Sequence, residues 1–111
     1  MQVVTSREGA VTVLKPLGPI IIGELDELDS QLQELARKWT KRIVINMSVA
    51  TFIDSAGLEL LDRHYQRLSE NGLEIKLSNV NEISLKILEL TRISNDFEIY
   101  CDTAAAARSF L

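Results

Sequence analysis

The stretch that decides the fold is Ile43-Val44-Ile45-Asn46-Met47, an apolar run with a single polar interruption. A strand that is buried on both faces has this composition, because neither of its faces meets water. Such strands are typical of parallel sheets, in which helices cover both faces. The run therefore predicts a central parallel strand.

Amphipathic patterns lie before and after this strand. Before it, apolar residues recur every three or four positions, the spacing that places them on one face of a helix. They are Leu25, Leu28, Leu32, Leu35 and Trp39. After it, a second helix is expected to end at Asn71-Gly72, because glycine favours the left-handed backbone that terminates helices. Its apolar stripe comprises Leu58, Leu61, Tyr65 and Leu68.

Four further runs have the composition of strands. Val3 to Ser6 and Val11 to Lys15 are rich in β-forming residues, and their spacing suits an antiparallel hairpin. Leu73 to Leu77 alternates apolar with charged residues, which is typical of a strand with one face toward water. Phe97 to Tyr100 has the pattern of a last strand.

Two more helices are expected in the second half of the chain. One is opened by Ser78 to Asn81 and carries the apolar residues Ile83, Ile87 and Leu90. The other is a short alanine-rich helix from Ala104 to Phe110, because alanine has the highest helix propensity. Asp102-Thr103 would cap it by accepting the free N–H groups of its first turn.

The expected order of elements is β-β-α-β-α-β-α-β-α. Strands that alternate with helices after an initial hairpin predict an α/β domain with a mostly parallel sheet. The hairpin adds an antiparallel edge strand at the N-terminus, and about four helices surround the sheet. We expect residues 1–111 to form one domain.

Composition and charge indicate a globular domain and disfavour some kinds of ligand. The chain has 111 residues, 12 Lys and Arg against 16 Asp and Glu, and a formal net charge of -4. Hydrophobic residues make up 46% of it and charged residues 25%, which is ordinary globular usage and unlike that of disordered segments. The negative balance counts against direct nucleic-acid binding, since phosphate neutralisation needs clustered basic side chains.

The sequence also favours a cytoplasmic setting. Cys101 is the single cysteine, so no intrachain disulfide can form. The first residues lack the basic and apolar regions of a secretory signal. The densest apolar stretch, Gly18 to Gly23, meets Glu24 and Asp26 at once, far short of the roughly 20 residues that span a bilayer. Direct membrane insertion is therefore not expected.

Enzymatic and metal chemistry find little support. His64, the single histidine, is expected on the surface or rim of its helix, and with Cys101 it makes no metal set. Neither a phosphate-binding loop nor a dinucleotide motif occurs. We expect no metal and no cofactor.

Acidic pairs occur at helical spacing. Asp26 with Asp29, and Glu59 with Asp62, are expected on solvent faces rather than as acid and base catalysts. Glu59 and Arg63 are four positions apart and could form a weak surface pair.

The turn Asp54-Ser55-Ala56-Gly57-Leu58 stands out, because it joins the buried strand to an amphipathic helix. Asp54 or Ser55 could serve simply as the N-cap of that helix. Alternatively, Ser55 could be a phosphorylation site, since a helix N-terminus tolerates a phosphate while the added charge would disturb a docked partner. A hydrolase nucleophile at Ser55 is disfavoured, because Ile53 stands where Gly-x-Ser-x-Gly requires glycine.

The sequence resembles the STAS domain family, the fold of bacterial anti-sigma factor antagonists. The resemblance begins with Ile43 to Ser48 and the Phe52 to Leu58 turn, and it extends over nearly the whole chain. Later segments match in order: Asn71-Gly72, Lys76 to Val80, Ile87 to Ile93, Phe97 to Tyr100 and Ala107 to Phe110.

This resemblance implies a regulatory role without enzymatic activity. In the family, a serine kinase that doubles as an anti-sigma factor phosphorylates the serine that corresponds to Ser55. The unphosphorylated domain binds the kinase and frees its sigma factor; phosphorylation ends binding, and a serine phosphatase restores it. The implied partner-binding surface consists of Asp54, Ser55, Ala56, Gly57, Leu58, Glu59, Asp62, Arg63 and Gln66.

One position departs from the family. Members commonly carry Gly-x-Leu-Asp near the end of the second strand, and counting back from the following helix places Ile21 where the Asp should be. Gly23-Glu24-Leu25-Asp26 reproduces these letters five residues out of register. The departure leaves open a second role, a non-switching STAS subunit of a bacterial lipid-transport ABC complex.

Overall fold

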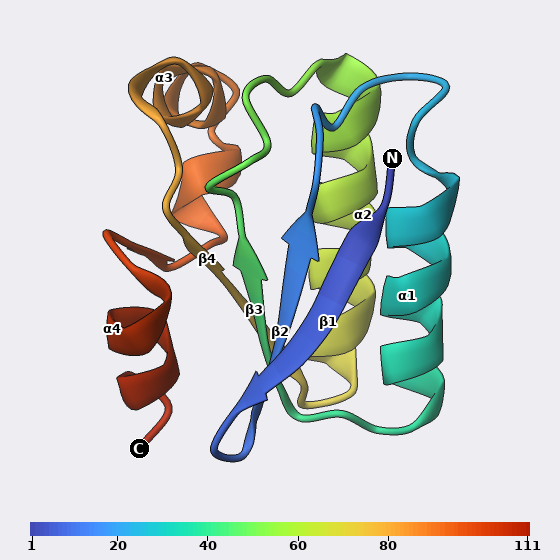
Figure 1. Ribbon diagram of the computed structural model, residues 1–111, viewed down its shortest axis with the longest axis vertical. Helices are drawn as coiled ribbons and strands as arrows, with labels where there is room; N and C mark the ends of the chain where they lie inside the picture. The colour runs from blue at the N-terminus through green and yellow to red at the C-terminus, as the bar shows by residue number, and fades with distance from the viewer.

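The computed structural model describes residues 1–111, apart from the side chain of Ser94 (Figure 1). Within this described part, the elements in chain order are β1 (Val3–Glu8), β2 (Val11–Pro16), α1 (Asp26–Arg37), β3 (Arg42–Asn46), α2 (Ser55–Glu70), β4 (Glu74–Ser78), α3 (Glu82–Leu90), the 3₁₀ helix η1 (Ile93–Asn95), β5 (Ile99–Tyr100) and α4 (Thr103–Arg108). The predicted order of strands and α-helices is confirmed.

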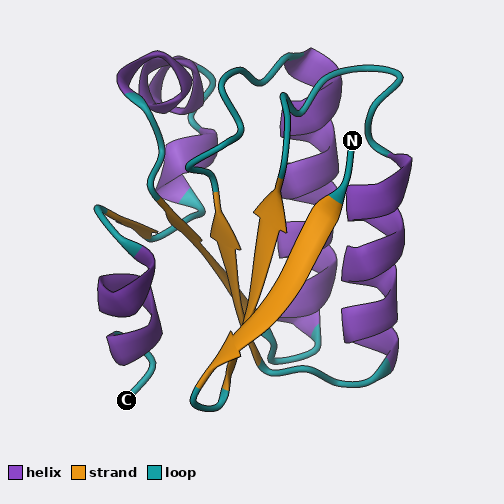
Figure 2. Cartoon of the chain, viewed as in Figure 1, coloured by secondary structure: helices purple, strands orange, loops and turns teal.

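The described strands form one mixed sheet in the order β1-β2-β3-β4-β5 (Figure 2). β1 runs antiparallel to β2, and the other neighbours run parallel. Val44 of β3 lies beside Val13 of β2 and Lys76 of β4. The fold is thus the predicted single α/β domain with an antiparallel N-terminal edge strand.

The central strand β3 is covered on both faces, as its apolar run predicts. Ile43 and Ile45 face the larger core, to which α1, α2 and α3 contribute buried side chains. Val44 faces the smaller core, where it meets Val11, Val13 and Ala106. Of the described helices, α4 alone contributes to this second core.

Helix α1 ends earlier than its apolar stripe predicts. The helix stops at Arg37, and the side chain of Trp39 is 62% exposed. Trp39 N–H donates to the carbonyl of Ala36, and Thr40 N–H donates to the carbonyl of Leu35. This pair of bonds is a Schellman motif, in which the chain reverses at a left-handed residue. Trp39 is that residue, with φ 57°, so the expectation that it faces the core is wrong.

Helix α3 is rotated relative to the expected orientation. Ile83 is 63% exposed and Leu90 is 76% exposed, whereas Ser84 and Leu88 are buried. The Asn81 side chain sets this rotation, because it caps the helix by accepting from Ser84 N–H and donates to the carbonyl of Thr51. The predicted element is correct, but its outward face carries two of the three apolar residues that define its pattern.

Strand β4 lacks the water-facing side that its alternation predicts. Lys76 is 4% exposed, because α4 covers it. Its Nζ atom donates to Ser109 Oγ at 2.8 Å and lies 3.0 Å from a carboxylate oxygen of Glu98. The same atom lies 4.1 Å from the centre of the Phe110 ring. The charged residue thus anchors α4 instead of facing water.

Candidate functional site: the turn at the start of helix α2

Asp54 is the N-cap of α2, and both oxygens of its carboxylate accept backbone hydrogen bonds. Oδ1 accepts from Gly57 N–H and Oδ2 accepts from Ile22 N–H, each at 2.9 Å. The Ile22 bond, followed by the Gly57 bond, lowers the pKa of Asp54, because both donors stabilise the ionised form. The carboxylate therefore ties the start of α2 to the loop between β2 and α1.

The same loop lies against Gly57 in van der Waals contact. A Cβ atom at position 57 would lie 2.2 Å from the carbonyl oxygen of Ile20. That carbonyl accepts from Asp54 N–H at 3.3 Å, and Ile20 N–H donates to the carbonyl of Phe52 at 2.9 Å. Position 57 therefore requires glycine, because only an absent side chain lets the helix approach this backbone.

Ser55 is the first residue of α2, and it is exposed. Since Asp54 provides the cap, the Ser55 hydroxyl is not needed for that purpose. The first helical turn has backbone N–H groups without helical acceptors, and the helix dipole is positive there. Ser55 thus presents a hydroxyl to solvent at a site that favours negative charge.

The residues predicted to contact a partner divide into exposed and buried groups. Besides Ser55, the exposed ones are Glu59, Arg63 and Gln66. Ala56, Asp54 and Asp62 are half-buried. Gly57 and Leu58 are buried, with Leu58 in the larger core. In this conformation Gly57 and Leu58 pack within the domain itself, and their contact with a partner stays a prediction.

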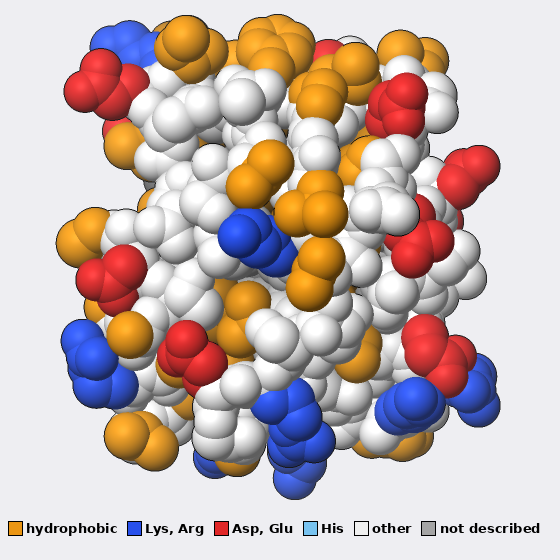
Figure 3. Space-filling view, in the orientation of Figure 1, with side chains coloured by type: hydrophobic (Ala, Val, Ile, Leu, Met, Phe, Trp, Pro, Cys, Tyr) orange, Lys and Arg blue, Asp and Glu red, His pale blue; other side chains and the backbone are white. Residues whose placement is uncertain are grey.

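Two exposed apolar side chains flank the turn and were not predicted as part of the site. Ile22 is 75% exposed and Phe52 is 45% exposed. The N–H of Ile22 donates to the Asp54 carboxylate, and the carbonyl of Phe52 accepts from the N–H of Ile20. Hydrophobic side chains lie along the upper edge of the molecule in Figure 3, where Figure 1 places the start of α2. Sequence periodicity gives no signal for them, because they belong to loops.

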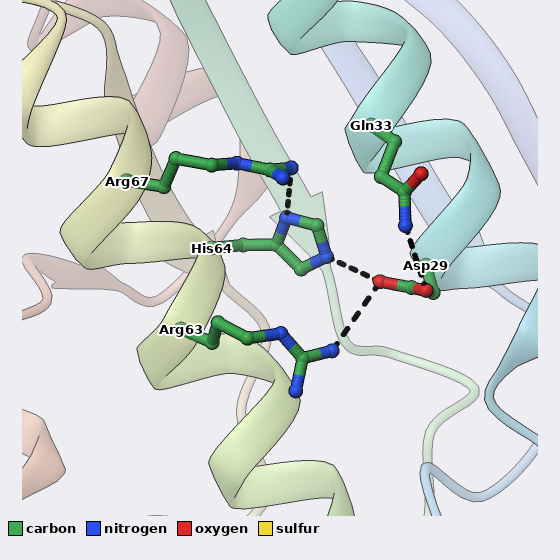
Figure 4. A network of polar contacts seen from close by, with 5 residues as sticks. All are labelled: Asp29, Gln33, Arg63, His64 and Arg67. Atoms are coloured by element: carbon green, nitrogen blue, oxygen red, sulfur yellow. Dashed lines mark hydrogen bonds and ion pairs between the residues drawn. The ribbon is translucent and has the colours of Figure 1, made fainter.

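His64 is not on the helix surface, contrary to the sequence-based expectation. Its side chain is 1% exposed and its Nε2 atom lies 2.6 Å from Oδ1 of Asp29 on α1 (Figure 4). Arg67 lies 3.1 Å from Nδ1, and since a guanidinium can only donate, Nδ1 accepts. His64 is therefore neutral, and burial, the largest cause, lowers its pKa.

Arg63 also belongs to this network. Its guanidinium lies 3.4 Å from Oδ1 of Asp29, so its ion-pair partner is Asp29 rather than the expected Glu59. Gln33 donates to the other oxygen of Asp29 at 2.9 Å. Asp29 is thus half-buried and connects α1 to α2, whereas its spacing predicts a residue free on the surface.

The side chains that could act as a base toward Ser55 are engaged in other contacts. A serine nucleophile needs a base within hydrogen-bond reach. The single histidine is held by Asp29 and Arg67 further along α2, and both Asp54 oxygens accept from backbone N–H groups. Among the described residues there is no cluster of three or more His, Cys, Asp or Glu side chains that could hold a metal ion.

A family model agrees with this geometry. The model of the STAS domain matches residues 2–106. The chain belongs to the STAS domain family. The Asp54 to Leu58 turn is thus a segment of a STAS fold, in which a buried parallel strand is followed by the start of a helix.

Solved structures of STAS proteins have the same fold. An anti-sigma factor antagonist from Mycobacterium paratuberculosis matches with a TM-score of 0.87 and 18% identity, covering 97% of this chain and 92% of that one. A STAS domain protein from Planctomyces limnophilus matches with a TM-score of 0.81 and 21% identity, covering 97% of each chain. Anti-sigma factor antagonists are therefore among the structural neighbours of this chain.

The fold also matches part of an anion transporter. The murine Slc26a9 anion transporter matches with a TM-score of 0.74 and 13% identity, and the match covers 88% of this chain but 17% of the transporter. In the part of the present chain that the structure describes, no helix combines the length and apolar character needed to cross a membrane.

The Gly23 to Asp26 segment of this STAS domain lies outside the turn that holds Asp54. Asp26 begins α1, and Glu24 pairs with the N-terminal amine of Met1 at 2.9 Å. In the adjoining loop, Ile21 is half-buried and Ile22 supplies its N–H to Asp54. The loop thus approaches the turn through its backbone and apolar side chains.

Proposed function

We propose that this protein is an anti-sigma factor antagonist whose binding to an anti-sigma factor is ended by phosphorylation of Ser55. The observation that carries the proposal is the exposed Ser55 hydroxyl on the first turn of α2, directly after the capping Asp54. A hydroxyl at such a place can enter the active site of a kinase without unfolding of the domain. The anti-sigma factor would itself be that serine kinase, and a serine phosphatase would restore the binding form.

A phosphate on Ser55 would change the surface more than the fold. It adds about -1.5 to -2 charges at pH 7, at a helix N-terminus that accommodates anions. The exposed apolar side chains of Ile22 and Phe52 flank the same turn. In a complex they would be buried against the partner, where a dianion beside the ionised Asp54 is costly to desolvate. Phosphorylation would therefore end binding while the free domain stays folded.

The exposed side of α2 would extend this contact. Glu59 and Gln66 are exposed, and Asp62 is half-buried. Two acidic residues on this side favour a partner that presents basic groups around an apolar contact. The proposal places the exchange of partners in the bacterial cytoplasm, where sigma factors act.

The test is the intact mass after incubation with ATP and the partner kinase. We expect one added phosphate on the wild-type protein and none on Ser55→Ala. Ser69→Ala is the matched control, because Ser69 is an exposed serine near the other end of α2, and it should be phosphorylated like the wild type. Ser55→Asp should lose kinase binding while Ser55→Ala retains it. An unmodified wild-type protein, with a kinase that is active on another substrate, would refute the proposal.

A second role is favoured by the loop before α1. This loop meets the turn with Ile21 and Ile22, whereas the family resemblance calls for an acidic residue at position 21. A STAS subunit of a lipid-transport ABC complex would need no modification of Ser55. It would co-purify with an ATPase whether or not Ser55 is replaced, and this result would favour the second role.

A further inference from the structure

The connection between α1 and β3 combines basic charge with an exposed aromatic ring. Its sequence is Arg37-Lys38-Trp39-Thr40-Lys41-Arg42, which places four basic residues around the single tryptophan of the chain. The Trp39 side chain is 62% exposed. Tryptophan is enriched at interfaces and at the surface of membranes, where one end of the ring is apolar and the other wet. The function proposed above does not use this segment.

The backbone at Trp39 is strained. Trp39 occupies the left-handed position of the Schellman motif, with φ 57°. Glycine is the usual residue there, because a bulky side chain in this conformation clashes with its own backbone. Glycine would adopt this backbone conformation with less strain. The exposed indole buries little apolar surface that could offset the strain. Backbone strain that side-chain packing does not offset often marks a functional site.

The basic charge of this segment is only partly neutralised within the protein. Glu34 pairs with Arg37 at 2.5 Å and with Lys38 at 3.5 Å. Lys41 and Arg42 are exposed, and among residues 1–93 and 95–111 neither has an ion-pair partner within 4.0 Å. Lys and Arg side chains gather along the lower edge of the view in Figure 3, where Figure 1 places the connection from α1 to β3.

This basic segment lies at the opposite end of the sheet from Ser55. It leads into the first residue of β3, whereas Ser55 follows the last residues of that strand. The molecule measures 29 × 26 × 25 Å, and the Debye length at physiological salt is about 8 Å. Glu59 and Asp62, near the start of α2, are therefore screened from an anionic surface that meets the basic segment, despite the net charge of -4. Glu74 lies beside Arg42 in the sheet and reduces the positive charge of the segment.

A membrane fits this segment better than a nucleic acid does. Sites for single-stranded nucleic acid combine a basic groove with several stacked aromatic rings, whereas here a single indole stands on a loop. Tryptophan prefers the headgroup level of a bilayer, and neighbouring Lys and Arg side chains attract anionic lipid. One aromatic ring and a few cations on a loop match a flat, negatively charged surface.

We propose that the segment Arg37–Arg42 binds reversibly to membranes that contain anionic lipid, with the indole of Trp39 at headgroup level and Lys41 and Arg42 on the lipid phosphates. No part of the chain needs to span the bilayer. The surface is distinct from the Ser55 turn, so the proposal does not depend on the proposed function. A membrane at one end of the sheet leaves the other end free to bind a protein.

The experiment uses Trp39 as its own reporter, because no other tryptophan contributes to the emission. The full chain is titrated with vesicles of phosphatidylcholine and phosphatidylglycerol in equal parts, with vesicles of phosphatidylcholine alone, and with an oligothymidine strand. We expect a blue shift of the emission and co-sedimentation with the anionic vesicles, both decreasing as salt is raised. Lys41→Gln should weaken binding about fivefold, the effect of one basic residue near an anionic membrane.

Three variants sharpen the test. Trp39→Gly suits the left-handed backbone, so it should fold normally and yet co-sediment less than the wild type. Arg42→Gln combined with Lys41→Gln should weaken binding about 25-fold. Lys86→Gln removes an exposed basic residue of α3 and should bind like the wild type.

Four results would each overturn the proposal. They are the absence of a shift with anionic vesicles, equal binding to phosphatidylcholine alone, unchanged binding by Trp39→Gly, and an equally large loss with Lys86→Gln. A shift with oligothymidine alone would assign the segment to nucleic acid instead.

Discussion

The Nε2 atom of His64 lies 2.6 Å from the Oδ1 atom of Asp29, which joins α2 to α1 through a buried ring. Nδ1 accepts from Arg67, so Nε2 carries the proton and donates it to the carboxylate. A second proton on the ring would break the Arg67 bond and place two cations together. The hydrogen bond from Arg67 therefore depends on a neutral histidine, whereas Nε2 donates to Asp29 in either state of the ring.

Stability should fall as the pH drops below neutrality. Burial lowers the pKa of His64 in the folded protein, whereas the pKa of a histidine in the unfolded chain is about 6.5. As the pH decreases through about 6.5, His64 binds a proton in the unfolded chain but stays neutral in the folded protein. The free energy of unfolding therefore falls over this range. We expect the free energy of unfolding, measured by urea titration, to decrease between about pH 7 and pH 5.5.

His64→Gln provides the control for this pH dependence. Glutamine keeps a donor for Asp29 but does not titrate. Its stability should change less with pH than that of the wild type over the same range, and the difference isolates His64 from the carboxylates. Identical pH profiles for the two proteins would contradict the assignment of a neutral, buried ring.

Gly57→Ala should destabilise the domain by about 1–3 kcal/mol, the usual cost of overpacking. The added methyl group would lie 2.2 Å from the carbonyl oxygen of Ile20, which is backbone and cannot rotate away. Thermal unfolding measures the effect. Ala56→Gly is a useful comparison, because it alters the neighbouring residue without adding atoms; a larger loss there than at Gly57 would argue against the close contact.

Lys76→Ala should cost about 2 kcal/mol, from the loss of a charged hydrogen bond and a cation–π contact. The Nζ atom bonds Ser109 and lies over Phe110, so the loss should appear as weaker docking of α4. Hydrogen exchange in α4 should increase accordingly. Lys76→Met keeps the apolar stem and should lose less. Lys86→Ala, at an exposed position of α3, should leave stability within about 0.5 kcal/mol.

Trp39→Gly should raise the free energy of unfolding by about 0.5–1 kcal/mol, because glycine relieves the left-handed strain. The urea midpoint measures the gain. Trp39→Ala keeps a Cβ atom at φ 57° and should not show it. A loss of stability on Trp39→Gly would mean that the indole contributes more through packing than the strain costs.

The sequence predicts well those features whose cause lies in neighbouring residues. Ile43 to Asn46 forms the central strand because its own composition demands cover on both faces. Asp54 caps α2 because the acceptor and the donor of that bond are three positions apart. Ser55 was predicted at the start of this helix for the same local reason.

Features that depend on a distant partner were missed. His64 occupies the buried stripe of α2 with Leu61 and Leu68, but a histidine can be buried there only because Asp29 reaches it from another helix. Lys76 is buried because α4 returns to cover it. The periodicity of one segment contains no information about either of these contacts between distant segments.

The end of a helix also limits what periodicity can predict. The stripe from Leu25 to Trp39 continues past Arg37, where the helical hydrogen bonds stop and the chain reverses. In α3 the pattern is correct in period but its rotation is set by the Asn81 cap, so Ile83 faces outward. Both errors arise at helix ends, where side-chain and backbone bonds decide the geometry.

The order of strands across the sheet is also their order along the chain. Each strand after β1 therefore pairs with the strand that precedes it in the chain, and none has to be inserted between two earlier ones. The pairing of β1 with β2 needs only a tight turn, and every later strand extends the sheet by one step. This order requires no rearrangement of earlier strands when a later one pairs, and β5, the shortest strand, forms the edge opposite β1.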